Sequence, residues 1–367
     1  MRFLIRNASV YLHGEGVRPR SILVEGKRIV RVSEGDIEAS AMPIDLAGYT
    51  VMPGFINTHV HLMDCYNGFD TGRLRKWLNA GITHLRDQGI LSYHTTVDAV
   101  QWKRDCANDC TVPSLSVCGK FLSTQNGYGG ADPIALHSEE DAKDAVKRLA
   151  DTGVDHIKIP YDEGYDPYTQ SLDLLSEPML AAIYGEANRQ NLRVSAHVLR
   201  MQRLKTLLRT GIDEAAHVPM DALDDDTIRD MVRNRVAMTP TLSTYGMLHA
   251  EFGAPMIHQA MDNVLRFVRQ GGIIGFGDDF VEEKSVWGTV GMPYMEIELL
   301  QKAGLTMTEI IDAATFGGAA VMGRDDLGRI CEGSVADLIA VKGDPLAFPY
   351  LLSNVQFVMK NGIAVKQ

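Results

Sequence analysis

The chain has 367 residues, 45% of them hydrophobic and 23% charged, which is typical of a globular protein long enough for one large domain and a smaller one. Its net charge of -11 argues against a nucleic-acid or anionic-membrane partner, so we expect a small-molecule substrate. The five cysteines include no C-x-x-C pair and no apolar run reaches membrane-spanning length, so we exclude a disulfide framework and a membrane span and expect a cytoplasmic protein.

Both ends of the chain show the alternation of β-strands. Residues 1–52 alternate apolar and polar residues in short runs broken by glycine. Residues 328–367 do the same, and Asn361-Gly362 is a dipeptide favoured at hairpin turns. We therefore expect the two ends to form one small β-sandwich domain. A homo-oligomer is possible, but the sequence does not decide it.

The middle of the chain, residues 53–327, alternates apolar strands with helical segments such as 138–153 and 176–191, in which apolar residues recur at spacings of three and four. Eight strands are predicted, at 51–61, 81–88, 113–121, 154–160, 192–198, 213–218, 235–243 and 271–279. Eight such units predict the α/β class and a (β/α)8 TIM barrel, with its active site at the carboxyl ends of the strands.

Polar residues occur where several of these strands end. His59 and His61 project to the same face of the first strand, because the side-chain period of a strand is two. The others lie on the fourth, fifth, sixth and eighth strands: Lys158, His197, His217, Asp278 and Asp279. Each alone could be structural, but their joint placement at one face of a barrel indicates a metal site.

The sequence resembles the amidohydrolase superfamily, and within it the imidazolonepropionase-like and Xaa-Pro or Xaa-Arg dipeptidase-like branch. The similarity covers nearly the whole chain. It is carried by "VMPGFINTHVH", "GITHLRDQG", "GVDHIKI", "GFGDD" and "IIDAATFGGAAVMG" followed by "LGRICEGSVADLIAVKGDPL".

This resemblance implies a centre of two metal ions, with zinc as the expected metal. His59, His61 and Asp279 would hold the more buried ion, and His197 and His217 the more exposed one. Lys158, carboxylated on its amine, would bridge the two. The implied activity is hydrolysis of an amide C–N bond, peptide or other, by a metal-activated hydroxide, with Asp279 moving the proton. The substrate would be a cyclic amide, an N-acyl amino acid or a dipeptide.

The chain departs from the family pattern at two places. Tyr128 stands where relatives commonly carry a histidine, and Gly-Asp-Asp replaces Gly-Thr-Asp, which leaves Asp278 as the alternative to Asp279. By spacing we expect Asp279 to be the functional residue.

Candidate substrate-binding residues are Arg200, Tyr128 and Tyr245. Arg86 and Lys120 are further candidates, although Arg86 could instead pair with Asp87, and the loop with Trp287 could form a pocket wall or lid.

Three other functions remain open. The same centre could hydrolyse esters, lactones or organophosphates. A deaminase is less expected, because that chemistry in the family generally uses one metal without the lysine of the fourth strand. A non-catalytic binding protein should have lost some of the ligands, and this chain keeps the full set.

Overall fold

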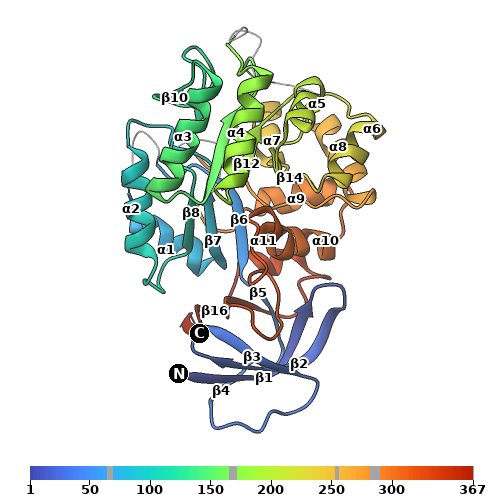
Figure 1. Cartoon of the computed structure of the whole chain (residues 1–367). Helices are drawn as coiled ribbons and strands as arrows, with labels where there is room; N and C mark the ends of the chain where they lie inside the picture. The colour runs from blue at the N-terminus through green and yellow to red at the C-terminus, as the bar shows by residue number, and fades with distance from the viewer. Residues whose placement is uncertain (64–68, 165–171, 253–255, 282–289, 367) are drawn as a thin grey trace.

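The computed structural model describes residues 1–63, 69–164, 172–252, 256–281 and 290–366, without the side chains of 248–252. Strands gather at both ends of the chain and the middle alternates strands with helices, so the fold is mixed α/β (Figure 1). Within these ranges, no helix is long and apolar enough to cross a lipid bilayer.

The two ends of the chain contribute to one sheet, the terminal sheet. From edge to edge its strands run β17, β16, β15, β5, β1, β2 and β3, with β4 also paired to β1. Their bounds are β1 Arg2–Leu12, β2 Gly16–Glu25, β3 Arg28–Ser33, β4 Met42–Asp45, β5 Tyr49–Pro53, β15 Leu338–Lys342, β16 Phe357–Lys360 and β17 Ile363–Lys366. In β1, Phe3 and Ile5 are buried whereas Arg2 and Arg6 are exposed, as the side-chain alternation of a strand requires. Because β5 pairs with β15, the two ends of the chain are hydrogen-bonded to each other.

Strands in the middle of the chain form two parallel sheets, in the orders β6-β7-β8 and β11-β12-β13-β14. Their bounds are β6 Phe55–Val60, β7 Ile82–Asp87, β8 Ser114–Val117, β11 His156–Pro160, β12 Arg193–His197, β13 Glu214–Ala216 and β14 Ala237–Thr239; β9 Leu122–Ser123 and β10 Ile134–Ala135 form a separate pair. Every residue of β6, β7 and β11 is buried, as expected for parallel strands covered on both faces.

Backbone hydrogen bonds link these two sheets on both sides. The amide of Asp155, just before β11, donates to the carbonyl of Val117 in β8 at 2.8 Å. On the other side, residues 273–280 pass between β14 and β6. Gly275 N donates to Met238 O at 2.8 Å, and Thr58 N donates to Phe276 O at 2.8 Å.

The predicted strand over 271–279 is wrong as a regular strand. Only isolated bridges form in this region, at Ile274 and Phe280. One reason is that Asp279 has φ of 55°, outside the extended region of the backbone. The segment still packs closely against β6, since a Cβ added to Gly277 would lie 2.7 Å from the Cβ of His59.

The helices have the bounds α1 Thr71–Asn79, α2 Thr96–Cys106, α3 Glu139–Thr152, α4 Glu177–Arg189, α5 Met201–Thr210, α6 Asp225–Arg233, α7 Leu242–Phe252, α8 Met256–Arg269, α9 Tyr294–Lys302, α10 Met307–Asp312 and α11 Gly318–Val321, with a π-helical turn at Ala313–Gly317 and a 3-10 turn at Pro349–Ser353. The predicted helices at 138–153 and 176–191 are α3 and α4. In α3, the Ser138 side chain caps the first turn, and Gly153 ends the helix with φ of 103°.

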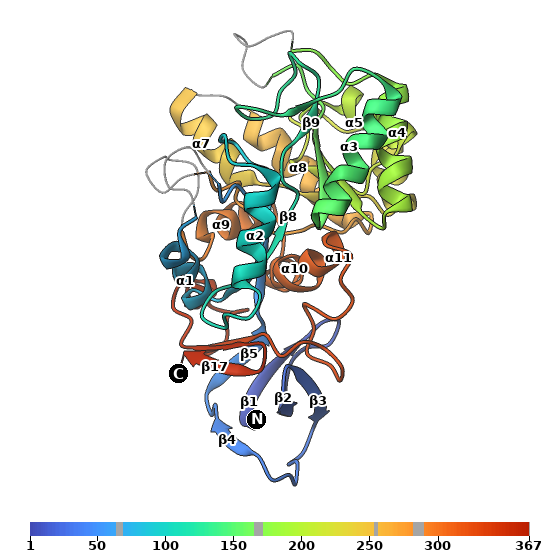
Figure 2. The same ribbon diagram turned by 60° about the vertical axis from the view of Figure 1, so that its left-hand side comes forward.

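Helices lie around the outside of the parallel strands, and the terminal sheet lies at one end of the molecule (Figures 1 and 2). Because β5 belongs to the terminal sheet and β6 begins two residues later, the parallel strands start next to that sheet. Their carboxyl ends therefore point away from it.

Candidate metal centre

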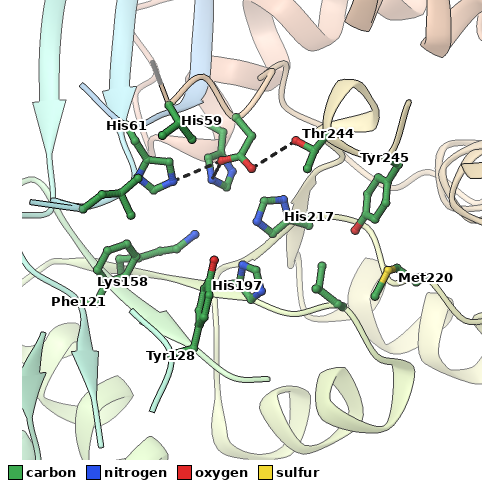
Figure 3. A pocket seen from close by; sticks show the side chains of 14 residues that line it. His59, His61, Phe121, Tyr128, Lys158, His197, His217, Met220, Thr244 and Tyr245 are labelled. Atoms are coloured by element: carbon green, nitrogen blue, oxygen red, sulfur yellow. Dashed lines mark hydrogen bonds and ion pairs between the residues drawn. The ribbon is translucent and has the colours of Figure 1, made fainter. Parts of the chain in front are cut away.

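A cavity of about 270 Å³ lies at the carboxyl ends of the parallel strands (Figure 3). Its lining combines histidines, one lysine and one aspartate with aromatic and aliphatic side chains: His59, His61, Leu91, Phe121, Tyr128, Lys158, His197, Leu199, His217, Met220, Thr244, Tyr245, Asp279 and Val281. Every ligand suggested by the resemblance is among them.

His59, His61 and Asp279 form the tightest group in this cavity. The Nε2 atoms of the two histidines lie 3.1 Å and 3.3 Å from the same carboxylate oxygen, Oδ1 of Asp279. One candidate ligand atom from each of the three residues lies within 4.8 Å of the others. The two histidines thus face one centre, in agreement with the side-chain period of β6.

Neighbouring groups orient these three side chains. His61 Nδ1 lies 2.8 Å from the carbonyl oxygen of Gly89, so Nδ1 donates to this carbonyl and the ring is held with Nε2 toward Asp279. The amide of Asp279 donates to the carbonyl of His59 at 3.0 Å, and Thr244 Oγ1 donates to Asp279 Oδ2 at 3.2 Å.

His197 ends β12, and His217 directly follows β13. Their ring centroids are 4.6 Å apart, and the His217 ring is 4.7 Å from that of His59. The Nδ1 atom of His217 lies 2.6 Å from Thr241 Oγ1, which leaves its Nε2 available to a ligand.

Lys158 lies in the middle of β11, only 1% exposed, and its amine points into the cavity (Figure 3). In the described part of the chain, its Nζ has no hydrogen-bond partner. Burial lowers the pKa of this amine to about 8, against the opposing effect of the Glu214 carboxylate.

The protonation states suit metal binding. Burial lowers the pKa of His59 to about 4 and that of His197 to about 3, so both imidazoles are neutral at pH 7. Burial alone would raise the pKa of Asp279, but the adjacent His59 and His61 hold it well below its usual range, so the carboxylate is ionised. Neutral imidazole and carboxylate are the forms that bind zinc.

Orphaned polar atoms test whether these residues fit a metal. Among the described residues, Nδ1 of His59 and Nζ of Lys158 are buried without a hydrogen-bond partner, and Nε2 of His59 has only the ion-pair contact of 3.1 Å with Asp279 Oδ1. Leaving such atoms unsatisfied costs free energy, and a bound cation would satisfy the His59 nitrogen that faces Asp279. The donor set therefore fits a metal ion.

Asp278 occupies a different environment from Asp279. It is 2% exposed and accepts a hydrogen bond of 2.7 Å from Asn57 Nδ2. It is absent from the cavity lining, whereas Asp279 is part of it.

Of the three candidate substrate-binding residues, two line the cavity and one does not. Tyr128 and Tyr245 line the cavity, with the Tyr128 ring 4.8 Å from that of His197. The hydroxyl of Tyr245 donates to the carbonyl of Val218 at 2.5 Å. Arg200 is exposed, precedes α5 as its N-cap, and is not in the lining.

Two other basic candidates form ion pairs outside the lining. Arg86 Nη1 lies 2.5 Å from Glu214 Oε2, so the expected pair with Asp87 is wrong. Adjacent residues of β7 point to opposite faces, and Asp87 instead accepts the amides of Leu62 and Gly89. Lys120 pairs with Asp132. The loop with Trp287 lies outside the described residues.

Sequence reasoning missed part of the lining, namely Leu91, Phe121, Leu199, Met220, Thr244 and Val281. Leu199 and Met220 follow His197 and His217 by two and three residues, so proximity to the histidines was an available signal. For Leu91, Phe121 and Val281 the apolar residue type was no signal of a place in the cavity lining.

The model of the Amidohydrolase family matches residues 50–365. The chain therefore belongs to the amidohydrolase family, as the sequence motifs predicted. This membership and the relatives below identify a metal-dependent hydrolase that acts on C–N bonds of the amide type.

Individual relatives agree with that class. Imidazolonepropionase of Streptomyces coelicolor is 26% identical over 347 residues, covering 88% of this chain and 85% of the relative. The crystal structure of an amidohydrolase is 26% identical, with a TM-score of 0.83 and coverage of 100% and 99%. A Xaa-Pro dipeptidase with methionine bound in its active site has a TM-score of 0.86 at 21% identity, covering 100% of both chains, and shows a likeness of fold.

Proposed function

We propose that this protein uses two metal ions to hydrolyse the amide C–N bond of a small molecule in the cavity of Figure 3. One observation carries the proposal. Four histidines, Asp279 and a buried lysine without a hydrogen-bond partner meet in a single cavity of an amidohydrolase-family chain. A cyclic amide, an N-acyl amino acid and a dipeptide are the substrate types that the resemblance suggests.

The proposed architecture is a (β/α)8 barrel over residues 53–327 with a β-sandwich domain from 1–52 and 328–367. The links from β8 to β11 and from β14 through residues 273–280 to β6 support closure of the parallel strands into a ring. A cytoplasmic location stays a prediction from the sequence.

In the proposed centre, His59, His61 and Asp279 would hold one zinc ion and His197 and His217 the other, and Lys158, carboxylated on its amine, would supply a ligand to both. A carbamate is an oxygen-donor anion, and zinc accepts imidazole nitrogen and carboxylate oxygen. When bound, the ions lower the pKa of a water molecule and polarise the substrate carbonyl.

The chain's own groups handle the proton and the orientation of the substrate. Asp279, ionised and held by Thr244 through Oδ2, accepts a proton from the water whose oxygen bonds the carbonyl carbon. It then delivers this proton to the nitrogen that leaves as the C–N bond breaks. Tyr128 would contact the substrate on the side of His197, and Tyr245, which lies in α7, would contact it on the side of that helix. Arg200 could contact only a substrate group that extends beyond the lining.

The test is a hydrolysis screen of zinc-loaded protein over cyclic amides, acyclic amides, N-acyl amino acids, dipeptides, lactones, esters, organophosphates and heterocyclic amines. Amide turnover that is lost on chelation and regained with zinc would support the proposal. Turnover of lactones, esters or organophosphates alone would overturn it in favour of the alternative hydrolase, and release of ammonia from a heterocyclic amine would indicate a deaminase.

A further inference from the structure

The cavity carries an apolar wall, which we define as Leu91, Phe121, Leu199, Met220 and Val281. Figure 3 shows Phe121 on the His61 side of the cavity and Met220 on the Tyr245 side. Phe121, Leu199 and Met220 are each at least 95% buried. A ligand beside the metal centre therefore meets hydrocarbon on both sides.

Close packing fixes this wall in place. A Cβ added to Gly89 would lie 2.5 Å from Cζ of Phe121, and one added to Gly129 would lie 3.1 Å from its Cβ. The amide of Met220 donates to the carbonyl of Leu199 at 2.8 Å, which holds these two residues together. These contacts hold Phe121, Leu199 and Met220 in place, so a ligand must fit against them.

Charged groups in the lining are already assigned to the metal centre. Within the described residues, Lys158 is the lining's one lysine or arginine and Asp279 its one carboxylate. Outside the lining, Arg203 pairs with Glu163 and Lys120 pairs with Asp132. The described lining therefore offers no further cation to a carboxylate on the substrate.

A carboxylate that lies against the apolar wall, away from the metal ions, loses its hydration, and without a cation or several donors this desolvation is unfavourable. The hydroxyl of Tyr245 already donates to Val218 and that of Thr244 to Asp279. Tyr128 supplies the third hydroxyl of the described lining, and one hydroxyl does not replace a cation. Uncharged amides do not suffer this penalty and gain from burial against the wall.

We infer that the substrate is a small uncharged amide with apolar groups on both sides of the C–N bond. The inference rests on the proposed function and narrows it to uncharged cyclic or acyl amides. It disfavours N-acyl amino acids and dipeptides, which carry a free carboxylate.

Two matched pairs of compounds test the inference on zinc-loaded full-length protein. For turnover, N-benzoylpyrrolidine should exceed N-benzoylproline in kcat/KM by at least about tenfold, since a difference of that size needs only about 1.4 kcal/mol. For binding, the uncleavable cyclopentyl phenyl ketone should bind at least about tenfold more tightly than 2-benzoylcyclopentanecarboxylic acid in calorimetry.

A substitution in the wall adds a second test. Met220→Lys should shift both preferences toward the carboxylate by about tenfold or more, whereas Met220→Leu should keep the wild-type preference. Equal or tighter binding of the keto acid, or no binding of the neutral ketone, would overturn the inference. If the neutral ketone is preferred but neither amide is cleaved, the inference on ligand class stands and the proposed amide hydrolysis fails for this pair.

Discussion

At the scale of single residues, the backbone at Asp279 separates two chemically identical side chains. Its positive φ of 55° turns Asp279 toward His59 and His61, while Asp278 remains on the side of Asn57. Aspartate tolerates this left-handed conformation better than most residues. The two carboxylates can therefore have different roles although they are adjacent in sequence.

Asp279→Asn should reduce kcat by about a hundredfold or more, because it removes the charge and proton-accepting capacity of the group that faces the histidines. Asp278→Asn should reduce kcat far less, and its main effect should be on thermal stability, because it alters a buried hydrogen bond to Asn57. Steady-state kinetics and thermal unfolding of both variants measure this. Loss of turnover in Asp278→Asn alone would show that the assignment of the two residues is reversed.

Lys158→Ala should lose most of the bound metal, because it removes the proposed bridging ligand. Metal analysis after desalting gives the first readout, and a carbamate carbon signal after loading with ¹³C-labelled carbon dioxide, present in wild type and absent in the variant, gives the second. Lys120→Ala is the matched control, since this lysine pairs with Asp132 outside the lining. Two retained metal ions in Lys158→Ala would rule out the bridge.

At the scale of elements, Glu296 of α9 holds the start of α7. It accepts hydrogen bonds from Leu242 N at 3.0 Å and from Ser243 N at 2.7 Å, and a third from Ser243 Oγ at 2.6 Å. The next residue, Thr244, donates to Asp279. Glu296 is therefore a positioning residue for the metal centre.

Burial raises the pKa of Glu296 from 4.5 to about 7, so the folded state binds this proton more tightly than the unfolded state. The protonation of Glu296 therefore contributes fully to the free energy of unfolding below pH 4.5, and this contribution is lost as the pH rises through about 7. Glu296→Gln should remove this slope. The wild type should lose roughly 3 kcal/mol relative to the variant over that range.

Thermal unfolding of wild type and Glu296→Gln at several pH values between 4.5 and 8 measures the slope. Glu298→Gln on the same helix is the control, because Glu298 is exposed and should leave the pH dependence as in wild type. Parallel curves for wild type and Glu296→Gln would contradict the raised pKa.

At the scale of the whole molecule, Tyr11 connects the terminal sheet to the helices. Its hydroxyl donates to Asp312 Oδ1 of α10 at 2.7 Å and lies 3.1 Å from the carbonyl of Thr308. Tyr11→Phe should lower the free energy of unfolding by about 1 kcal/mol, without change in metal content or kcat, because Tyr11 is not in the cavity lining. Tyr93→Phe, at a residue 80% exposed, should show no change in thermal unfolding. A fall in metal content in Tyr11→Phe would show that the two regions are coupled.

Much of the fold was predictable because it depends on local patterns. Alternation in β1 and the spacing of Ala142, Val146 and Leu149 in α3 each report which face of the element is buried. The segment 271–279 was predicted as a strand because it is apolar, but its backbone follows close packing against β6 instead. A sequence pattern indicates which residues are hydrophobic, but it does not indicate contacts with distant strands.

The sequence by itself determined that His59 and His61 share a face and that Lys158, His197 and His217 follow or occupy strands of one series, because the period of a strand and the direction of parallel strands are local properties. Only the tertiary structure decided that Arg86 pairs with Glu214, 128 residues away, and that Phe121, Leu199 and Met220 wall the cavity. The reason is physical. A strand fixes the direction of its own side chains, whereas the partner each one meets depends on how distant elements pack together.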